Sequence, residues 1–427
     1  MNKGLYVLLT ALIIPALILS ACGSDKVAES KLERVSNPDV AASEVEQLVA
    51  GNTAFGFDLY QVVRSSDGNV VFSPYSISLA FAMAYSGARG ETANQMADVL
   101  HYSLPGDQFH PAFNALDLDL AHRPDQTAGV KENERFQLSI ANALWGQEGW
   151  PFIPEYLDLL AVNYGAGMRL VDFENASESA RRQINDWISD QTNRRIKDII
   201  PPGMIDTSTR LVLANAIYFK ATWEYEFDAN DTADKPFHLL NGDPVSVPMM
   251  EIGHQENLSY TAGDGWQAVA LPYKGGLTEM VVIVPDAGNF EAFESALTSD
   301  RYAEILEAME SQEVILSMPK YTFETQYGLK DVLAGMGMQA AYNPDVADFS
   351  GIDGLRDLVI SDTIHKAFIA VDEKGTEAAA ATVVVFMTTG ALMPEGVILT
   401  IDRPFFYVIR DIPSGTILFM GRVVDPR

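Results

Sequence analysis

Cysteine and positive charge are both scarce in this chain. Cys22 is the only cysteine among 427 residues, so the chain cannot form an intrachain disulfide. A cysteine-based zinc site or a cysteine nucleophile is likewise excluded from the region that follows it. Lysine and arginine number 29 against 58 aspartates and glutamates, which gives a net charge of −29. A field of that sign repels nucleic acids and anionic lipid surfaces, so we expect neither as a partner.

Catalytic and metal-binding motifs are also missing. The six histidines form no H-E-x-x-H pair, and the sequence contains no G-x-S-x-G, no G-x-x-x-x-G-K-[ST] and no G-x-G-x-x-G. Catalytic triads are defined by geometry and leave no fixed spacing, so this absence is only part of the argument. Among so many carboxylates, a scattered one is read as a solvated surface group. We expect no enzyme, no metal and no cofactor.

The first 21 residues have the pattern of an export signal. Lys3 supplies a short positive start, and an apolar run follows over residues 5–19. The run ends in Leu19-Ser20-Ala21-Cys22-Gly23, which resembles a prokaryotic lipobox, in which the cysteine thiol receives a diacylglycerol and becomes the new N-terminus. Ordinary signal cleavage nearby, or an uncleaved anchor helix, are the alternatives. Each of the three predicts an exported protein, and the first predicts attachment to a membrane through lipid alone.

Residues 22–42 are polar, charged and interrupted by Asn37-Pro38. This composition predicts a flexible tether after the lipidated cysteine. No linker, repeat or low-complexity stretch interrupts residues 43–427, which we expect to form one domain.

Helical and extended patterns are unevenly distributed over this domain. Helical spacing of apolar residues occurs mainly in the first half, and β-prone runs dominate the last part. This order favours an α+β fold with large antiparallel or mixed sheets over a repeating βαβ fold. Helices are predicted over 44–63, 76–86, 92–100, 177–192 and 290–309, and strands over 136–145, 211–219, 280–284, 314–318, 364–371, 405–409 and 417–423.

Residues 371–387 combine opposite conformational tendencies. Four consecutive alanines at 378–381 favour a helix, whereas residues 382–387 are rich in β-prone side chains. The first half of the segment has no large side chain, so it could enter a narrow slot in a sheet. The pattern predicts a loop that changes conformation.

Residues 373–382 resemble the reactive-loop hinge of inhibitory serpins, and the resemblance covers residues 43–427. Each matching segment is moderately specific, but their order and spacing together are very specific. The other matching segments are 69–80 (NVVFSPYSISLA), 87–92 (GARGET), 185–227 with IKDIIPPG and LANAIYFK, 271–274 (LPYK), 318–320 (MPK) and 399–409 (LTIDRPFFYVI).

This resemblance implies a fold of three β-sheets and about nine helices with an exposed reactive-centre loop. A target protease attacks the loop of such a protein as a substrate. The loop then inserts into the largest sheet as a new strand, and the acylated protease is carried to the far end and distorted. By resemblance, the hinge comprises Glu373, Gly375, Thr376, Ala378, Ala379, Ala380, Ala381 and Thr382.

The hinge sequence can be tested against the alternation that a strand requires. Counting from Thr376, the inward positions are small at first and apolar later: Thr376, Ala378, Ala380, Thr382, Val384 and Phe386. Glu377 falls on the outer face, where it can stay solvated. No inward position carries a charge, whose burial would cost several kcal/mol. Gly375 supplies a backbone pivot.

Further residues correspond to other parts of a serpin. The resemblance implies a shutter, a polar network beneath the centre of the large sheet, formed by Ser73, Ser76, Asn215 and His365. It also places Trp223 at the breach, where the loop first enters the sheet, and pairs Lys320 with Glu373 at the base of the loop. Taken alone, His365 is better read as a satisfied core histidine, of which the shutter role is a special case, and Trp223 as a large core aromatic.

The family pattern places the cleaved bond after the seventeenth residue when Glu373 is counted as the first, which is the bond Thr389–Gly390. The segment after this bond is slightly long, so Met387–Thr388 is an alternative and Leu392–Met393 a further one. No lysine or arginine lies between Lys374 and Arg403, which disfavours trypsin-like targets. Elastase-, subtilisin- or chymotrypsin-like serine proteases fit better, and papain-like cysteine proteases are an alternative.

The sequence therefore predicts an exported, lipid-anchored inhibitor that forms a covalent complex with a serine protease. We expect a monomer that is prone to loop–sheet polymers, because residues 382–387 can pair with an open sheet edge. The alternative is a non-inhibitory serpin that acts as a binding or structural protein at the cell surface.

Overall fold

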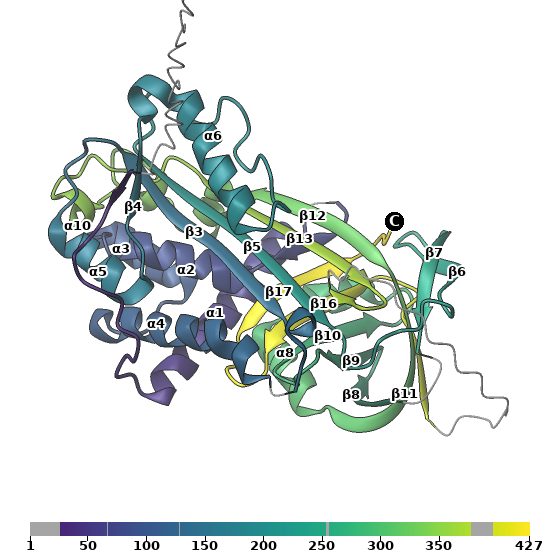
Figure 1. Ribbon diagram of the computed structural model, residues 1–427. Helices are drawn as coiled ribbons and strands as arrows, with labels where there is room; N and C mark the ends of the chain where they lie inside the picture. The colour runs from purple at the N-terminus through teal and green to yellow at the C-terminus, as the bar shows by residue number, and fades with distance from the viewer. Residues whose placement is uncertain (1–25, 66, 128, 253–255, 377–395) are drawn as a thin grey trace, which may run out of the picture.

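A computed structural model describes residues 26–65, 67–127, 129–252, 256–376 and 396–427 of the protein (Figure 1). The expected α+β class is confirmed, with helices gathered mainly in the first half of the chain. The α-helices in these ranges are α1 (Ala42–Val63), α2 (Pro74–Tyr85), α3 (Gly90–Leu100), α4 (Gly106–His122), α5 (Pro154–Tyr164), α6 (Phe173–Gln191), α7 (Phe290–Ser295), α8 (Ser299–Glu307), α9 (Leu329–Met336) and α10 (Ser350–Asp353).

The strands of the described ranges form two hydrogen-bonded networks. The first, the large sheet, has the order β1-β4-β3-β5-β14-β13-β12. Its strands are β1 (Lys26–Ala28), β4 (Met168–Val171), β3 (Gln137–Gln147), β5 (Leu211–Thr222), β14 (Gly375–Thr376), β13 (Thr363–Asp372) and β12 (Tyr321–Gly328).

The second network has the order β2-β17-β16-β10-β9-β8-β11-β7-β6, with β15 paired to β11. One end of β11 pairs with β8 and the other with β7, so two of the three expected sheets are joined by hydrogen bonds here. The strands are β2 (Val70–Phe72), β17 (Ile417–Val423), β16 (Phe405–Asp411), β10 (Thr278–Pro285), β9 (Trp266–Pro272), β8 (Glu256–Gly263), β11 (Glu310–Pro319), β7 (Pro244–Glu251), β6 (Ala233–His238) and β15 (Val397–Thr400).

The large sheet has apolar side chains on both faces. Its inner face, with Leu213 and Ile217 of β5, belongs to the main core that α1 and α2 help to fill. On its outer face, Ala214 and Ala216 belong to a separate cluster with Ile184 and Ile188 of α6. Figure 1 shows α6 lying over β3 and β5. The small alanines let α6 approach the sheet closely.

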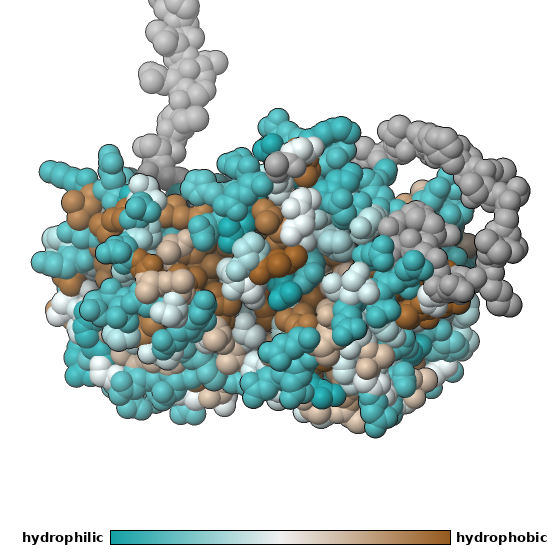
Figure 2. Space-filling model, turned by 90° about the horizontal axis from the view of Figure 1, so that it is seen from below, coloured by the Kyte–Doolittle hydropathy of each residue, from teal (hydrophilic) through white to brown (hydrophobic). Residues whose placement is uncertain are grey.

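The surface agrees with the strongly charged composition. Figure 2 shows a face on which hydrophilic side chains cover most of the area and hydrophobic ones show between them across the middle. Within the described ranges, no helix combines the length and the hydropathy needed to cross a membrane.

Two expectations about local structure were wrong. The single helix expected over 290–309 is two helices, because the side chain of Thr298 accepts a hydrogen bond from the Arg301 N–H and starts α8 anew. The tether expected over 22–42 is docked on the domain from Lys26 onward, since β1 pairs with β4 and Arg34 contacts α4. Cys22 and residues 1–21 lie outside the described ranges.

Candidate functional site

The two central strands of the large sheet, β5 and β13, pair directly over only part of their length. Residues 363–367 of β13 pair in parallel with 213–217 of β5. Nearer the other end of the sheet, β14 lies between the same strands and is antiparallel to both. The beginning of the predicted loop therefore already occupies a position in the middle of the sheet. Its pairs are Gly375 with Thr222 and Asp372, and Thr376 with Ala221 and Val371.

Gly375 is the point at which the chain turns from β13 into β14. Its φ is +154°, and a Cβ atom added there would lie 1.9 Å from the carbonyl oxygen of Ala221. No larger residue could approach β5 this closely. The side chain of Asp372 closes the turn by accepting hydrogen bonds from the N–H groups of Lys374 (2.8 Å) and Gly375 (3.3 Å).

Thr376 is the first loop residue whose side chain enters the core. It is 2% exposed, and its Oγ1 lies 2.6 Å from the hydroxyl of Tyr273. Tyr273 in turn stacks on Trp223, with ring centroids 4.5 Å apart. Burial raises the pKa of Tyr273 well above its ordinary value, so the hydroxyl stays protonated. The inward position that the alternation assigns to Thr376 is therefore occupied by a satisfied polar side chain.

Trp223 holds the backbone of the hinge at two places. Its indole N–H donates to the carbonyl of Asp372 (3.0 Å), and its backbone N–H donates to the carbonyl of Lys374 (2.9 Å). The N–H of Phe227 donates to the carbonyl of Glu373 (3.0 Å). Three successive hinge carbonyls thus have partners on the segment that follows β5.

The side chain of Glu373 is fixed by two donors. Lys320 Nζ lies 2.8 and 3.0 Å from its carboxylate oxygens, and Thr232 Oγ1 donates at 2.8 Å. Burial by itself would raise the pKa of Glu373. The hydrogen bond from Lys320, assisted by the backbone and Thr232, outweighs burial and holds this pKa below its ordinary value. The ion pair ties the base of the loop to the chain between β11 and β12.

A chain of alternating charges continues from the hinge across the end of the sheet. Lys374 Nζ lies 2.8 Å from one oxygen of Glu226, and Lys274 Nζ lies 2.7 Å from the other. Lys274 also contacts Glu134 at 3.2 Å. Each member is partly exposed, so each pair contributes little to stability alone. Together they connect the hinge to the segment that precedes β3.

Deeper in the molecule, the four expected shutter residues lie together beneath the sheet. His365 Nε2 accepts a hydrogen bond from the N–H of Ser73 (3.1 Å), and its Nδ1 faces the side-chain oxygen of Asn215. Nε2 must be unprotonated to accept, so the ring is neutral with its proton on Nδ1. Asn215 donates to the carbonyl and hydroxyl of Ser76, both at 2.7 Å.

A fifth member of this network, Asn142, was missed by the sequence analysis. It lies directly opposite Asn215 in the β3–β5 ladder and donates to the carbonyl of Ser76 at 3.1 Å. The available signal was an amide side chain in the apolar part of the β-prone run at 136–145. An amide enclosed by a sheet needs hydrogen-bond partners, and the half-buried Asn142 finds them in this polar network.

The remaining predicted site residues lie outside the described ranges. Within those ranges, no group of three or more histidine, cysteine, aspartate or glutamate side chains is arranged to hold a metal ion. The predicted residues concerned are Ala378, Ala379, Ala380, Ala381, Thr382, Met387, Thr388, Thr389 and Gly390.

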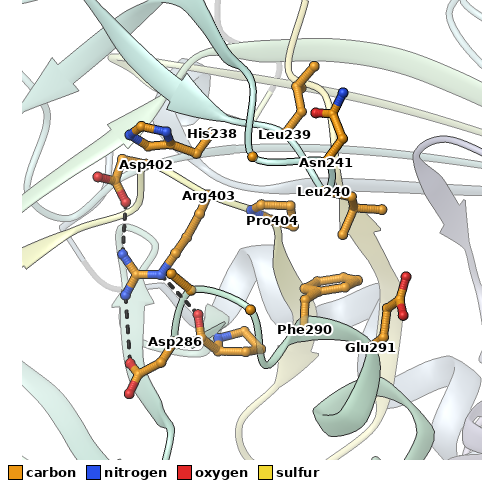
Figure 3. A pocket seen from close by; sticks show the side chains of 14 residues that line it. His238, Leu239, Leu240, Asn241, Asp286, Phe290, Glu291, Asp402, Arg403 and Pro404 are labelled. Atoms are coloured by element: carbon orange, nitrogen blue, oxygen red, sulfur yellow. Dashed lines mark hydrogen bonds and ion pairs between the residues drawn. The ribbon is translucent and has the colours of Figure 1, made fainter.

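A separate cavity of about 610 Å³ lies between the β6–β7 hairpin, the turn after β10 and the segment before β16 (Figure 3). Arg403 forms one wall. Its Nε donates to the carbonyl of Pro285 (2.9 Å), and its Nη1 lies 2.8 Å from Asp402. A longer ion pair joins it to Asp286 at 3.8 Å. These contacts fix the turn that carries the chain from β15 to β16.

The start of the predicted loop, β14, thus lies between β5 and β13 in the middle of the large sheet. The family described as Serpin (serine protease inhibitor) matches residues 50–426. The human leukocyte elastase inhibitor is 37% identical over 391 residues, which cover 90% of this chain and all of that protein. A serpin-like protein of Thermococcus kodakarensis is 43% identical over 377 residues, which cover 88% of this chain and 84% of that protein.

Solved structures agree with the sequence comparison. Native tengpin, a thermophilic serpin, superposes with a TM-score of 0.79 at 26% identity, covering 93% of this chain and 97% of that one. Uncleaved ovalbumin gives a TM-score of 0.77 at 28% identity, covering 89% of this chain and all of that one. The chain belongs to the serpin family. This membership supports protease inhibition in general over catalysis.

Proposed function

We propose that this serpin is an irreversible inhibitor of serine proteases that traps its target by inserting the reactive loop into the large sheet. The observation that carries the proposal is the pairing of Gly375 and Thr376 between β5 and β13. The first two residues of the new strand are in register, and Thr376 occupies an inward position.

Continuing this register gives a specific inserted state. Gly375 pairs with Thr222 and Thr376 with Ala221, so each later loop residue would pair with one residue earlier in β5. Residue 386 would then lie opposite Leu211, the first residue of β5. The inward loop positions would face the odd-numbered residues of β5, of which 211, 213, 217, 219 and 221 belong to the main core. The small and apolar inward residues of the loop suit that environment.

The energetics favour insertion after the loop is cut. About ten added residues form roughly ten ladder hydrogen bonds on each side, each contributing about 0.5–1.5 kcal/mol net. The sum reaches ten or more kcal/mol, which is comparable with the whole stability of a domain, about 5–15 kcal/mol. The uncut protein must therefore be trapped kinetically.

The proposed covalent step is the first half of ordinary proteolysis. The protease serine hydroxyl attacks the carbonyl of the scissile residue, and the amide nitrogen leaves as a new N-terminus after taking up a proton. The ester remains because insertion distorts the protease before water can hydrolyse it. The bond is Thr389–Gly390, with Met387–Thr388 as the alternative. The uncharged residues there favour elastase-, subtilisin- or chymotrypsin-like proteases over trypsin-like ones, with papain-like cysteine proteases as a further class.

We place this inhibitor at the cell surface, anchored by a lipid on Cys22. The support is the lipobox-like sequence at residues 19–23 and the position of Cys22 as the only cysteine. Metabolic labelling with a radioactive fatty acid would test the anchor, because a Cys22→Ser variant must lose the label.

Incubation with elastase and subtilisin, followed by denaturing gels, tests the inhibitory mechanism. We expect a complex that survives denaturation and has the summed mass of the serpin, cut in its loop, and the protease. N-terminal sequencing of the released C-terminal fragment identifies the cut bond. Simple cleavage and turnover by every protease tried would instead support the alternative of a non-inhibitory surface protein.

A further inference from the structure

The described chain begins with an arm, residues 26–41, that is docked on the outer edge of the large sheet. Within it, β1 pairs antiparallel with β4, and Lys26 lies opposite Leu170. Lys26 also forms an ion pair with Glu148. The arm therefore extends the sheet by one short strand at the edge farthest from β12.

Further along, the arm is held by α4 and α5. Arg34 Nε donates to the side-chain oxygen of Asn114 and Nη2 to that of Asp117, both at 2.7 Å. The N–H of Val35 donates to the carbonyl of Val162 at 3.0 Å, and Asn114 donates back to the carbonyl of Val35 at 2.8 Å. The docked path is thus specified by polar groups of the arm and of both helices.

The arm contributes little to the core, against which only its half-buried Ala28 and Val40 pack. None of its residues is buried, and the first buried residue of the described chain is Leu48 in α1. Leu32 and Val35 are 53% and 40% exposed, whereas Val27 and Val40 are half-buried. Partly exposed ion pairs and a three-residue edge strand contribute little free energy to the attachment of the arm to the domain. The arm can therefore detach without opening the core.

The arm starts at the end of the sheet opposite the hinge. Leu170 and Leu211 both pair with Gly146, so Lys26 lies level with the first residue of β5. The hinge lies at Thr222, the last residue of β5. Eleven residue steps separate the two ends, or about 36 Å. Figure 1 likewise shows β4 at one end of the molecule and β6 and β7 at the other.

A lipid on Cys22 would hold this far end of the sheet against the membrane. Only three residues separate Cys22 from Lys26, and four residue steps span at most about 14 Å. The hinge end, where a protease attacks, would face away from the membrane. Loop insertion would then carry the protease to the membrane side, and a protease of ~220 residues is about 40 Å across. A protease of this size cannot fit between the membrane and the end of the sheet, which are at most about 14 Å apart.

We propose that the arm is a reserve of tether that detaches when the trapped protease arrives. Freed from β4, α4 and α5, the chain from Cys22 to Ala42 extends to about 70 Å, which leaves room for the protease beside the membrane. Before trapping, the docked arm holds the loop outward. This inference rests on the proposed function, both on trapping by insertion and on the lipid anchor.

Locking the arm with a disulfide tests the inference. Lys26 and Leu170 are directly opposed, at the separation that suits a disulfide between strands. The double variant Lys26→Cys with Leu170→Cys is prepared in the lipidated protein on phosphatidylcholine vesicles, and in a soluble Cys22→Ser form. The measured quantity is the number of serpin molecules consumed per subtilisin molecule inhibited.

On vesicles, we expect oxidation to raise this ratio at least threefold and reduction to restore it. For the soluble form, oxidation leaves this ratio unchanged, because no membrane lies at the end of the sheet where the protease arrives. The single variant Lys26→Cys controls for the lost Lys26–Glu148 ion pair, and Leu170→Cys controls for the changed side chain on β4. A twelve-residue Gly/Ser insertion after Gly23 restores trapping by the locked protein on vesicles.

An oxidised protein that traps equally well on vesicles would refute the proposed release of the arm, but it would leave the proposed trapping mechanism intact. A failure to trap in solution would refute the proposed function instead.

Limited trypsin digestion gives a second readout that needs no substitution. Lys31 is exposed, and both Lys31 and Arg34 lie in the arm. On vesicles, we expect cleavage after these residues to accelerate at least fivefold once the subtilisin complex has formed. Equal rates before and after complex formation would show that the arm stays docked, and would overturn the inference.

Discussion

At the scale of single residues, the most sensitive point is His365 beneath the sheet. It is fully buried and neutral, and it accepts a hydrogen bond from the N–H of Ser73. Burial lowers the pKa of His365 to about 3, and burial likewise lowers the pKa of His110, a residue of α4 that contacts the hydroxyl of Tyr164, to about 4. A proton on Nε2 of His365 would remove the acceptor and place a charge inside the polar network.

The pH dependence of stability follows from these two histidines. Below pH 6.5 the unfolded chain binds protons that the native protein excludes, so stability is complete above that pH and is lost as the pH falls toward 4 and then 3. Each group contributes up to about 1.4 kcal/mol per pH unit within its window. We expect urea unfolding at pH 7.5, 6 and 5 to show this decline. It should become roughly half as steep in His365→Gln and stay unchanged in His122→Gln, at an exposed histidine. A His365→Gln protein with the full decline would show that His365 is not responsible.

At the scale of elements, the strand that the loop would form makes the sharpest prediction. In the register set by Gly375 and Thr376, Ala380 would face the core opposite Ile217, which is fully buried. We expect Ala380→Arg to leave protease binding and loop cleavage intact but to abolish the covalent complex, because a buried cation stalls insertion. Ala379→Arg is the matched control. It carries the same charge one residue earlier, on the outer face opposite Tyr218, and should trap at least half as well.

Denaturing gels and the ratio of serpin consumed to protease inhibited measure both variants. The ratio should rise more than tenfold for Ala380→Arg only. If the two variants behaved alike, the inserted strand would not have the proposed register.

Sequence patterns were most informative where a strand or helix has one environment along its length. The strand predicted over 417–423 is found with the same bounds, and α1 begins two residues before its predicted start. The prediction of one helix over 290–309 was wrong, because the hydroxyl of Thr298 caps the N-terminus of a second helix although the helical spacing of apolar residues continues. The short strands β1 and β14 were also missed, since each owes its conformation to partners distant in the sequence.

In the candidate site, too, features set by local backbone geometry were predicted, and features set by distant partners were missed. Alternation correctly assigned Thr376 to the inner face, because it depends only on backbone geometry. Tyr273 and Asn142 were missed, since their roles depend on which strand lies opposite. The chain of charges from Lys374 to Glu134 joins four segments and likewise left no pattern in the sequence.

At the scale of the whole molecule, the proposed function requires that the folded protein is not in its most stable state. The sheet contains a gap between β5 and β13 into which only two loop residues have entered. The polar contacts of Trp223 and Lys320 hold the hinge at that point. Completing the strand would separate residues 363–367 of β13 from 213–217 of β5 and would replace their direct pairing with ladder hydrogen bonds on both sides of the new strand. The uncut loop is tied at both ends, to β13 and β15, which prevents this.

Cutting the loop should therefore stabilise the protein. We expect a protein cleaved once within residues 387–390 to unfold at least about 12 °C higher than the intact one, because roughly ten or more kcal/mol of strand pairing becomes available. Differential scanning calorimetry before and after limited subtilisin treatment measures the change. Cleavage of the Ala380→Arg variant provides the control, since its loop should be cut without gaining this stability. An unchanged unfolding temperature after cleavage of the unmodified protein would favour the non-inhibitory alternative.

The same gap predicts how the intact protein fails on heating. Mild warming should open β5 from β13 far enough for the loop of a second molecule to enter, since residues 382–387 are β-prone and uncharged. We expect polymers on native gels at temperatures below the unfolding transition. A synthetic peptide of residues 376–387 should prevent them by filling the gap first, whereas a peptide with Ala380→Arg should not. Polymers that form equally with either peptide would mean that the gap is not where the molecules join.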